Sequence, residues 1–258
     1  MNFFHFRGGE LYCEDVPVRT IADKVGTPFY LYSASTIKRH VRVFAEAFSG
    51  IDHLVCYSVK ANSNLAVLRL MAGMGTGADI VSGGELHRAM KAGIDPSRIV
   101  FSGVGKTARE MELALEAGIL MFNVESGEEL QTLARVACSL GKTAPVAMRV
   151  NPDVDPKTHP YISTGLKKNK FGIPVTEALA LYRQAAELDG IRVAGIDCHI
   201  GSQLTNSDPF GEAVMRLMDL IEKIEGEGIP IRYLDIGGGL GIIYDKESPP
   251  LPADYAET

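Results

Sequence analysis

The stretch Leu54-Val55-Cys56-Tyr57-Ser58-Val59-Lys60-Ala61-Asn62 decides how the fold is interpreted. An apolar, β-prone run ends here in a lysine, and turn residues follow at once. The pattern predicts a buried strand with Lys60 at its last position, so that the ammonium group points beyond the carboxyl end of the sheet. Because burial disfavours the charged form of a lysine, such an amine can act as a nucleophile. The alternative is a lysine that ends the strand and extends its charged group into water.

A repeating unit continues from this strand: an apolar strand, a polar loop, an amphipathic helix and a glycine. A helix predicted over 35–48 precedes the first unit. The seven predicted strands cover residues 54–59, 78–81, 99–102, 120–124, 146–150, 193–199 and 233–236. Four helical runs close with a glycine followed by an isoleucine, a pair that can cap a helix end; these are Gly93-Ile94, Gly118-Ile119, Gly190-Ile191 and Gly228-Ile229.

Repeated strand–helix units predict a parallel sheet. A TIM-type (β/α)8 barrel arranges eight such strands around a packed interior. We therefore expect an α/β fold with a TIM-type (β/α)8 barrel that is incomplete, with about seven strands present. On this interpretation the chain ends just before the eighth strand. A natural seven-stranded or open sheet is the alternative.

The composition narrows the class of protein. The 258 residues are 46% hydrophobic and carry a net charge of −6, which disfavours nucleic-acid binding because phosphate contacts need clustered Lys and Arg. No apolar run reaches the ~18 residues that span a bilayer, and residues 1–10 lack the unbroken apolar core of a signal peptide. The four cysteines form no CxxC pair and the six histidines no HxxxH pair. We therefore expect no metal site and a cytoplasmic protein.

Polar residues gather where the predicted strands end, which is where barrels of this kind carry their chemistry. Each one has a structural explanation of its own, such as a helix cap or a solvated loop position, but their joint placement exceeds what stability requires. These residues are Lys60, Asp79, Ser82, Glu85, Ser102, Glu125, Arg149, Asn151, His199, Ser202 and Asp235.

Gly237, Gly238 and Gly239 follow the last predicted strand. Without side chains, their backbone N–H groups can close on a phosphate, or the run can form a tight turn with no ligand. The run is not a Rossmann fingerprint, because Gly239-Leu240-Gly241 is followed by two isoleucines and the third glycine is absent.

Another glycine-containing motif resembles the end of a P-loop. In Gly105-Lys106-Thr107 the lysine and threonine fit, but Val100 stands where the first glycine of a P-loop belongs. We therefore interpret Lys106 as a loop lysine and expect no ATP site. Thr107 with Glu110 fits a capping box at a helix start, as do Ser126 with Glu129.

A long loop is predicted over 151–172, and loops of that length are commonly lids or binding loops. It carries a positive cluster on an acidic protein, which could attract a substrate with several carboxylates or could be a solvated basic surface. The cluster comprises His159, Lys167, Lys168 and Lys170.

Four motifs carry a resemblance to a known family: Tyr-Ser-Val-Lys-Ala-Asn at 57–62, Gly-Ala-Asp-Ile-Val-Ser-Gly-Gly-Glu at 77–85, Cys-His-Ile-Gly-Ser-Gln at 198–203 and Asp-Ile-Gly-Gly-Gly at 235–239. Together they resemble the pyridoxal-phosphate decarboxylases built on an alanine-racemase-like barrel, which include the diaminopimelate, ornithine and arginine decarboxylases. The segment 165–172 is similar to the same family. The His-Ile-Gly-Ser-Gln form and the Gly26-Thr27-Pro28 entry favour the diaminopimelate branch.

The resemblance implies pyridoxal 5′-phosphate as the cofactor. Lys60 would hold it as a Schiff base and His199 would lie against its ring, so these two are the implied catalytic residues. Phosphate contacts would come from Ser202 and the glycine run, and support for the lysine and the ring from Asp79 and Arg149. The implied cofactor-binding residues are Lys60, Asp79, Arg149, His199, Ser202, Gly237, Gly238 and Gly239.

The implied activity is decarboxylation of meso-2,6-diaminopimelate to L-lysine, a lyase reaction of lysine biosynthesis. The resemblance divides the chain into an N-terminal segment, 1–30, associated in the family with a second β-domain, and a pyridoxal-phosphate barrel, 31–258. It further implies that the last barrel strand and the C-terminal β-domain are missing, that this portion is poorly active alone, and that the full-length protein is a homodimer acting on a small amino acid.

Two other functions stay open at this point. One is a sister decarboxylase for another amino acid or a polyamine precursor, such as ornithine, arginine or carboxynorspermidine. The other, of a different class, is a non-catalytic homologue that binds pyridoxal phosphate or a protein partner.

Overall fold

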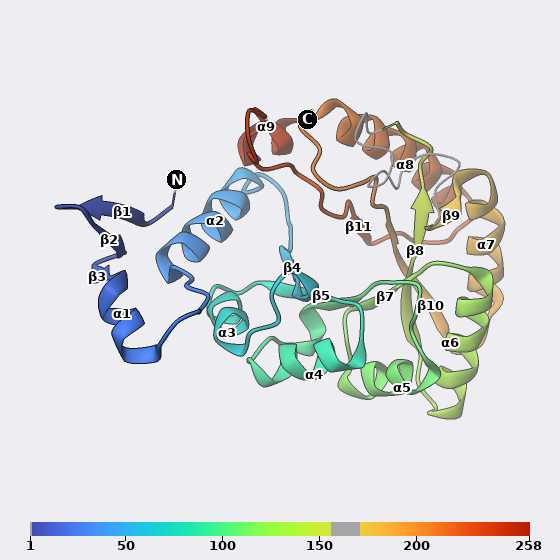
Figure 1. Cartoon of the computed structure of the whole chain (residues 1–258). Helices are drawn as coiled ribbons and strands as arrows, with labels where there is room; N and C mark the ends of the chain where they lie inside the picture. Colours follow the sequence, from blue (N-terminus) through green and yellow to red (C-terminus); the bar gives the residue numbers. More distant parts are fainter. Residues whose placement is uncertain (1, 156–170) are drawn as a thin grey trace.

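Seven parallel strands form a curled sheet in the computed structural model, which describes residues 2–155 and 171–258. The strand order is β11-β10-β8-β7-β6-β5-β4, and a two-residue strand, β9 (Ile173–Pro174), pairs with β8. Figure 1 shows the strands curling with their helices on the outside. This confirms the predicted incomplete TIM-type barrel. The seven strands are β4 (Cys56–Ser58), β5 (Gly77–Ile80), β6 (Ile99–Phe101), β7 (Met121–Val124), β8 (Ala144–Asn151), β10 (Ile191–Asp197) and β11 (Tyr233–Asp235).

The outer faces of the strands pack on helices that follow them in the chain. Their apolar side chains, among them Phe101, Phe122 and Ile196, are fully buried in one cluster with the inner faces of the helices. The inner faces of the strands contribute only a small apolar cluster, because polar side chains occupy the other inward positions. The covering helices are α3 (Leu65–Gly73), α4 (Gly83–Lys91), α5 (Ala108–Ala117), α6 (Gly127–Ser139), α7 (Val175–Glu187) and α8 (Asp208–Gly226), and 3-10 turns lie at η1 (Val59–Ala61) and η2 (Pro96–Arg98).

The predicted helix ends are largely confirmed. Thr107 and Glu110 form the expected capping box at the start of α5. The side chain of Ser126 caps α6, but Glu129 bonds elsewhere, so that box is only half formed. The glycines of the four Gly-Ile pairs all adopt positive φ angles, which is the conformation that a glycine can take at a helix end.

The N-terminal segment forms a small antiparallel sheet, β1 (Phe4–Arg7), β2 (Glu10–Cys13) and β3 (Val16–Pro17), followed by α1 (Val18–Val25). This sheet lies beside the barrel, at the blue end of the chain in Figure 1. It contacts the start of α2 (Ala34–Ala47), where Ser33 Oγ donates to Glu14 Oε1 at 2.7 Å.

The β-prone run Phe29-Tyr30-Leu31-Tyr32, which follows the Gly26-Thr27-Pro28 break, predicts a strand from the sequence, and this prediction is wrong. These residues form no strand in the structure, and the side chain of Tyr30 is 91% exposed. Aromatic and branched residues favour strands mainly by fitting a half-buried pleated surface. Without a neighbouring strand that preference has no effect.

The two ends of the barrel sequence meet through helices. α9 (Pro252–Glu257) packs against α2, and the ring of Tyr255 lies among Phe44, Phe48 and Phe210. Figure 1 shows α2 and α9 side by side. Within the described residues, β4 and β11 are each paired with one neighbouring strand and lie at the two edges of the sheet. Among those residues, no helix combines the length and the apolar composition needed to cross a membrane.

A side chain from α7 stabilises an irregularity between β8 and β10. The pairing register shifts between Val193 and Gly195. The hydroxyl of Tyr182, which is fully buried, donates to Gly195 O at 2.8 Å and accepts from Met148 N at 3.4 Å. The hydroxyl therefore satisfies two backbone groups that the shift removes from regular pairing.

Replacing this hydroxyl tests its contribution. We expect Tyr182→Phe to lower the free energy of unfolding by about 1–3 kcal/mol, because two buried backbone groups lose a partner. Urea denaturation measures this change. The matched control is Tyr30→Phe at an exposed ring, for which we expect a change within about 0.5 kcal/mol. Equal effects of the two substitutions would contradict the assignment.

Candidate functional site

Lys60 lies just beyond the carboxyl end of β4, as predicted, but not as the last residue of a buried strand. The strand ends at Ser58, and Lys60 belongs to the 3-10 turn η1, where its side chain is exposed while the preceding Val59 is fully buried. Tight winding of the chain after Ser58 turns the lysine out of the sheet. The carboxyl ends of the parallel strands form one rim of the barrel. An exposed amine on this rim can be reached by a ligand.

Asp79 lies on the neighbouring strand β5, in register with Ser58. Ser58 Oγ donates to Asp79 Oδ2 at 2.8 Å. The second carboxylate oxygen, Asp79 Oδ1, is buried and has no hydrogen-bond partner among the described residues. Asp79 does not cap a helix, since Ser82 caps α4. An unpartnered buried oxygen on this rim is a free acceptor facing the site.

Arg149 near the end of β8 forms a buried ion pair. Its Nη1 lies 2.6 Å from Glu125 Oε1, and the side chains are 13% and 4% exposed. Glu125 Oε2 also accepts from Gly172 N at 3.1 Å, and the guanidinium lies 5.4 Å from the centroid of the Phe171 ring. Glu125, for which a solvated loop position was considered, is therefore a buried partner of the predicted site residue.

His199 lies two residues beyond the end of β10 and is largely buried. Burial, with the positive charges of Arg149 and Lys60, lowers the pKa of its imidazole to about 4. Its ring is therefore neutral at pH 7. The influence of both cations on one imidazole also places the ends of β4, β8 and β10 on the same side of the barrel.

The glycine run lies against the loop that follows β10. A Cβ at Gly237 would come within 2.9 Å of His199 Nδ1, and one at Gly239 would collide with the carbonyl oxygen of Gly201. Leu204 N donates to Gly239 O at 2.8 Å and joins the two loops. Close packing thus explains two of the three glycines.

Gly237 is exposed although it is closely packed. Gly238 and Ser202 are accessible as well. Both are exposed, and a Cβ at Gly238 would meet no atom within 4 Å. The run therefore combines a tight backbone turn with an open position, which fits an oxyanion better than a packed turn alone does.

Three polar residues that the sequence analysis missed or left without a role lie beneath the rim. Asn123 Nδ2 donates to Ser102 Oγ at 3.1 Å and, across the barrel, to Asp235 Oδ2 at 3.0 Å. Asp235 Oδ1 in turn accepts from Gly237 N at 2.9 Å. Asp197 is the in-register neighbour of both Arg149 and Asp235.

Burial raises the pKa of the carboxyl groups of Asp197 and Asp235 above the ordinary value. Repulsion from Asp235 adds to the rise at Asp197, and repulsion from Asp79 adds to the rise at Asp235. The period-2 alternation of a strand could have revealed Asp197, because it faces the same side as His199. A single asparagine within the apolar run Met121–Val124 was the corresponding signal for Asn123.

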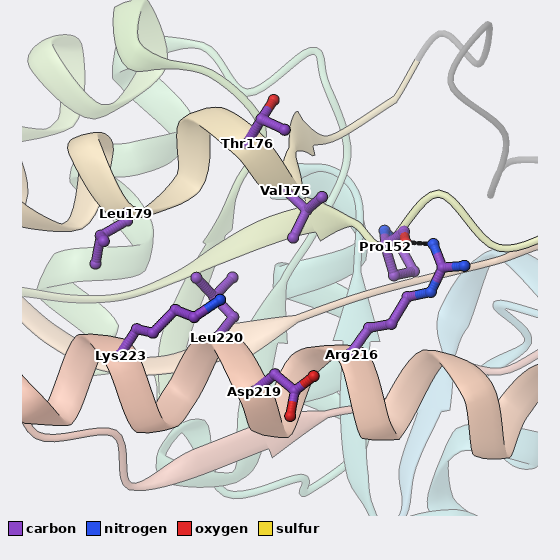
Figure 2. Close-up of a pocket in the computed structure, with 8 residues that line it drawn as sticks. All are labelled: Pro152, Val175, Thr176, Leu179, Arg216, Asp219, Leu220 and Lys223. Carbon is purple, nitrogen blue, oxygen red and sulfur yellow. Dashed lines mark hydrogen bonds between the residues drawn. The ribbon is translucent and has the colours of Figure 1, made fainter.

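Two hollows lie elsewhere on the barrel. One of about 370 Å³ lies between α7 and α8, where Arg216 Nη1 donates to Pro152 O at 2.7 Å (Figure 2). It contains no predicted site residue. Another of about 630 Å³ borders Glu125 and Gly172. Of the site residues described above, Glu125 and Gly172 border the second hollow, and neither hollow is lined by Lys60, His199 or the glycine run.

The predicted loop cluster of His159, Lys167, Lys168 and Lys170, and the similarity over 165–170, lie outside the described residues. Within 2–155 and 171–258, no group of three or more His, Cys, Asp or Glu side chains is arranged to hold a metal ion.

The lowered pKa of His199 predicts a pH dependence. An unfolded chain takes up a proton on this residue near pH 6.5, whereas the folded chain does so only near pH 4. The contribution of His199 to stability is therefore fully present above pH 6.5 and is lost as the pH falls from about 6.5 to about 4. An NMR titration of the imidazole, assigned with His199→Gln, measures the folded value.

Arg149→Met separates the causes of this shift. We expect the pKa of His199 to rise, because a positive charge is lost, but to stay below 6.5, because burial remains. Arg183→Met, which removes an exposed arginine, is the control and should leave the value unchanged. A value near 6.5 in the unmodified chain, or no rise in Arg149→Met, would contradict this account.

Comparisons with known proteins agree with this geometry. The family model for the pyridoxal-dependent decarboxylase, pyridoxal binding domain, matches residues 34–258. The diaminopimelate decarboxylase of Pseudomonas aeruginosa is 57% identical over 255 residues, which are 99% of this chain and 61% of that protein. The diaminopimelate decarboxylase of Vibrio cholerae is 54% identical over 258 residues, 100% of this chain and 62% of that protein.

Solved structures show the same likeness. Diaminopimelate decarboxylase from Helicobacter pylori, complexed with L-lysine, superimposes with a TM-score of 0.90 at 46% identity, covering 93% of this chain and 61% of that one. The enzyme from M. jannaschii, in co-complex with L-lysine, gives a TM-score of 0.92 at 42% identity over 98% and 61% of the two chains. The chain thus spans about three fifths of the length of the relatives it matches, and it belongs to the family of pyridoxal-dependent decarboxylases, of which it carries the pyridoxal-binding domain.

Proposed function

We propose that this chain is the cofactor-binding barrel of a pyridoxal-phosphate-dependent decarboxylase that converts meso-2,6-diaminopimelate to L-lysine. The observation that carries the proposal is the common rim on which an exposed lysine, a neutral, partly buried imidazole and an open glycine turn lie. The names and lysine complexes of its relatives supply the substrate. Because the chain spans about 61% of those relatives, the activity is assigned to the whole protein.

The residues on the rim fit the chemistry of pyridoxal phosphate. The cofactor needs an amine for its aldehyde, donors for its phosphate and a surface for its ring. Lys60 offers an exposed amine, Ser202 and Gly238 an open hydroxyl and backbone, and His199 a neutral ring. The unpartnered Asp79 Oδ1 supplies an acceptor for a cationic group.

Each residue then has a distinct task. Lys60 would hold the aldehyde of the cofactor through its exposed Nζ. His199 would provide a surface for the ring, and its neutral state avoids a further positive charge beside Lys60 and Arg149. The Glu125–Arg149 pair holds the guanidinium on the rim without leaving either charge unpaired. When bound, pyridoxal phosphate supplies a conjugated system that accepts the electron pair released as the bond to the carboxylate breaks.

The glycines divide the work of holding the phosphate. Gly237 and Gly239 let the two loops approach closely, since side chains there would strike the backbone of the neighbouring loop. This approach brings together the loops that carry Gly238 and Ser202, whose exposed backbone N–H and hydroxyl groups can donate to a phosphate. Substitution at Gly237 or Gly239 would therefore disturb the loop before it affects any direct ligand contact.

The remaining assignments follow the same family. We propose that residues 1–30 belong with a second, β-rich domain and that 31–258 form the barrel proper. We further propose a cytoplasmic homodimer acting on a small amino acid. A sister decarboxylase for ornithine, arginine or carboxynorspermidine, and a non-catalytic homologue that binds cofactor or partner, are the alternatives that the experiments below distinguish.

Attachment of the cofactor is tested on this chain. After incubation with pyridoxal phosphate and reduction with borohydride, we expect one stable adduct, and peptide mass spectrometry should place it on Lys60, because that amine is exposed on the rim. Lys60→Ala should abolish the yellow colour and the adduct, while Lys142→Met should keep both. An adduct spread over several surface lysines would contradict specific attachment.

The substrate is tested on the whole protein. We expect carbon dioxide release from meso-diaminopimelate to exceed release from ornithine and arginine by at least about 100-fold, since unpaired polar groups in a site penalise the wrong substrate. Faster release from ornithine or arginine would favour the sister decarboxylases. Cofactor binding without release from any of them would favour the non-catalytic homologue.

A further inference from the structure

Lys106, which the sequence analysis interpreted as a loop lysine, is buried and fully bonded. Its side chain is 0% exposed. The ammonium group donates to Gly103 O at 2.7 Å, to Asn123 O at 2.7 Å and to Glu129 Oε1 at 2.6 Å. An ammonium group has three donors, so its capacity is used completely. Burying a lysine in this way is costly and calls for a specific gain.

The partner of Lys106 extends these bonds to a second backbone group. Glu129 Oε2 accepts from Glu125 N at 3.0 Å. Lys106 and Glu129 together therefore hold the carbonyl group before Val124 and the N–H group after it. The first group lies within β7, whose pairing with β6 ends at Phe122 while its pairing with β8 continues to Val124, and the second group follows the end of the strand.

The two residues held in this way are those that carry the contacts of β7 to the site. Glu125 pairs with Arg149 and accepts from Gly172 N. Asn123 reaches across the barrel to Asp235, which holds Gly237 N. Among the described contacts, Gly172 N and Gly237 N donate to Glu125 and Asp235 rather than to Glu129, so an effect of the Lys106–Glu129 pair on these glycines passes through the end of β7.

We propose that the buried Lys106–Glu129 pair is a positioning device for the cofactor site: it fixes the end of β7 so that Glu125 meets Arg149 and Asn123 meets Asp235. The proposal rests on the proposed function for what the site binds, but not for the geometry of the device. If the pair stabilised only its own loop, its removal would not change the amide protection of Gly172 and Gly237.

Amide hydrogen exchange of the cofactor-free chain, followed by NMR, tests the device directly. In Lys106→Met we expect exchange at Gly172 and Gly237 to become about tenfold faster relative to the core amides, because each loses a fixed acceptor. Glu129→Gln, which keeps the side-chain volume, should accelerate the same two amides by a smaller factor. It also keeps the test valid if Lys106→Met fails to fold.

The control is Lys142→Met, which removes a lysine whose Nζ donates to Leu115 O at 2.9 Å. It should leave Gly172 and Gly237 unchanged. Acceleration limited to Glu125, or equal at all amides, would show a purely structural pair and overturn the proposal.

A cofactor titration separates this proposal from the proposed function. In the variants we expect the dissociation constant of pyridoxal phosphate to rise about tenfold, in parallel with the exchange at the two glycines. If the unmodified chain binds no pyridoxal phosphate, the proposed function fails. The hydrogen-exchange result still shows whether the Lys106–Glu129 pair positions the end of β7. If affinity stays constant while the glycines exchange faster, the device does not serve the cofactor and the proposal is overturned.

Discussion

In-register pairing of parallel strands is the constraint on which the site depends. Because paired residues of a parallel sheet face the same side, the pairs Asp197–Arg149 and Asp197–Asp235 fix three ionisable side chains in one row across β8, β10 and β11. The same pairing aligns Ser58 with Asp79 at the other edge of the sheet. A slip of one residue in any strand would turn its polar group outward into the apolar layer under the helices.

Burying ionisable groups at the strand ends costs desolvation energy, and two buried cations are neutralised there by a paired carboxylate rather than by solvent. Arg149 is neutralised by Glu125, and Lys106 by Glu129, both within hydrogen-bond distance. Buried ion pairs of this kind contribute little net stability, because desolvation consumes most of the attraction. Their contribution is to position other groups. Each pair forms hydrogen bonds to backbone groups that an apolar residue could not form. Such groups at the carboxyl ends of barrel strands are typical of a binding site.

Much of this arrangement could be predicted from the sequence. Hydrophobic runs of strand length, capping residues and the four Gly-Ile pairs were enough to predict all seven strands and the helices between them, because those signals are local. The placement of Lys60, His199 and the glycine run on one rim followed from the rule that parallel strands end at a common edge.

The remainder depended on contacts between distant segments. Lys60 is exposed because β4 ends at Ser58 and a 3-10 turn follows. The sequence alone could not distinguish this turn from a strand that continues to Lys60. The burial of Lys106 requires Glu129 and two carbonyl groups from different loops. Two of the three glycines are explained by the neighbouring loop rather than by a ligand. Each of these features is a property of packing, for which a linear pattern holds no signal.

A crystal structure of the chain with pyridoxal phosphate tests the central claim, that one rim brings an amine, an imidazole and a glycine turn to a single small ligand. The account predicts the aldehyde carbon at Lys60 Nζ, the ring against His199 and the phosphate at Ser202 and Gly238. Binding in the hollow between α7 and α8 instead, or contact with fewer than two of these three groups, would contradict it.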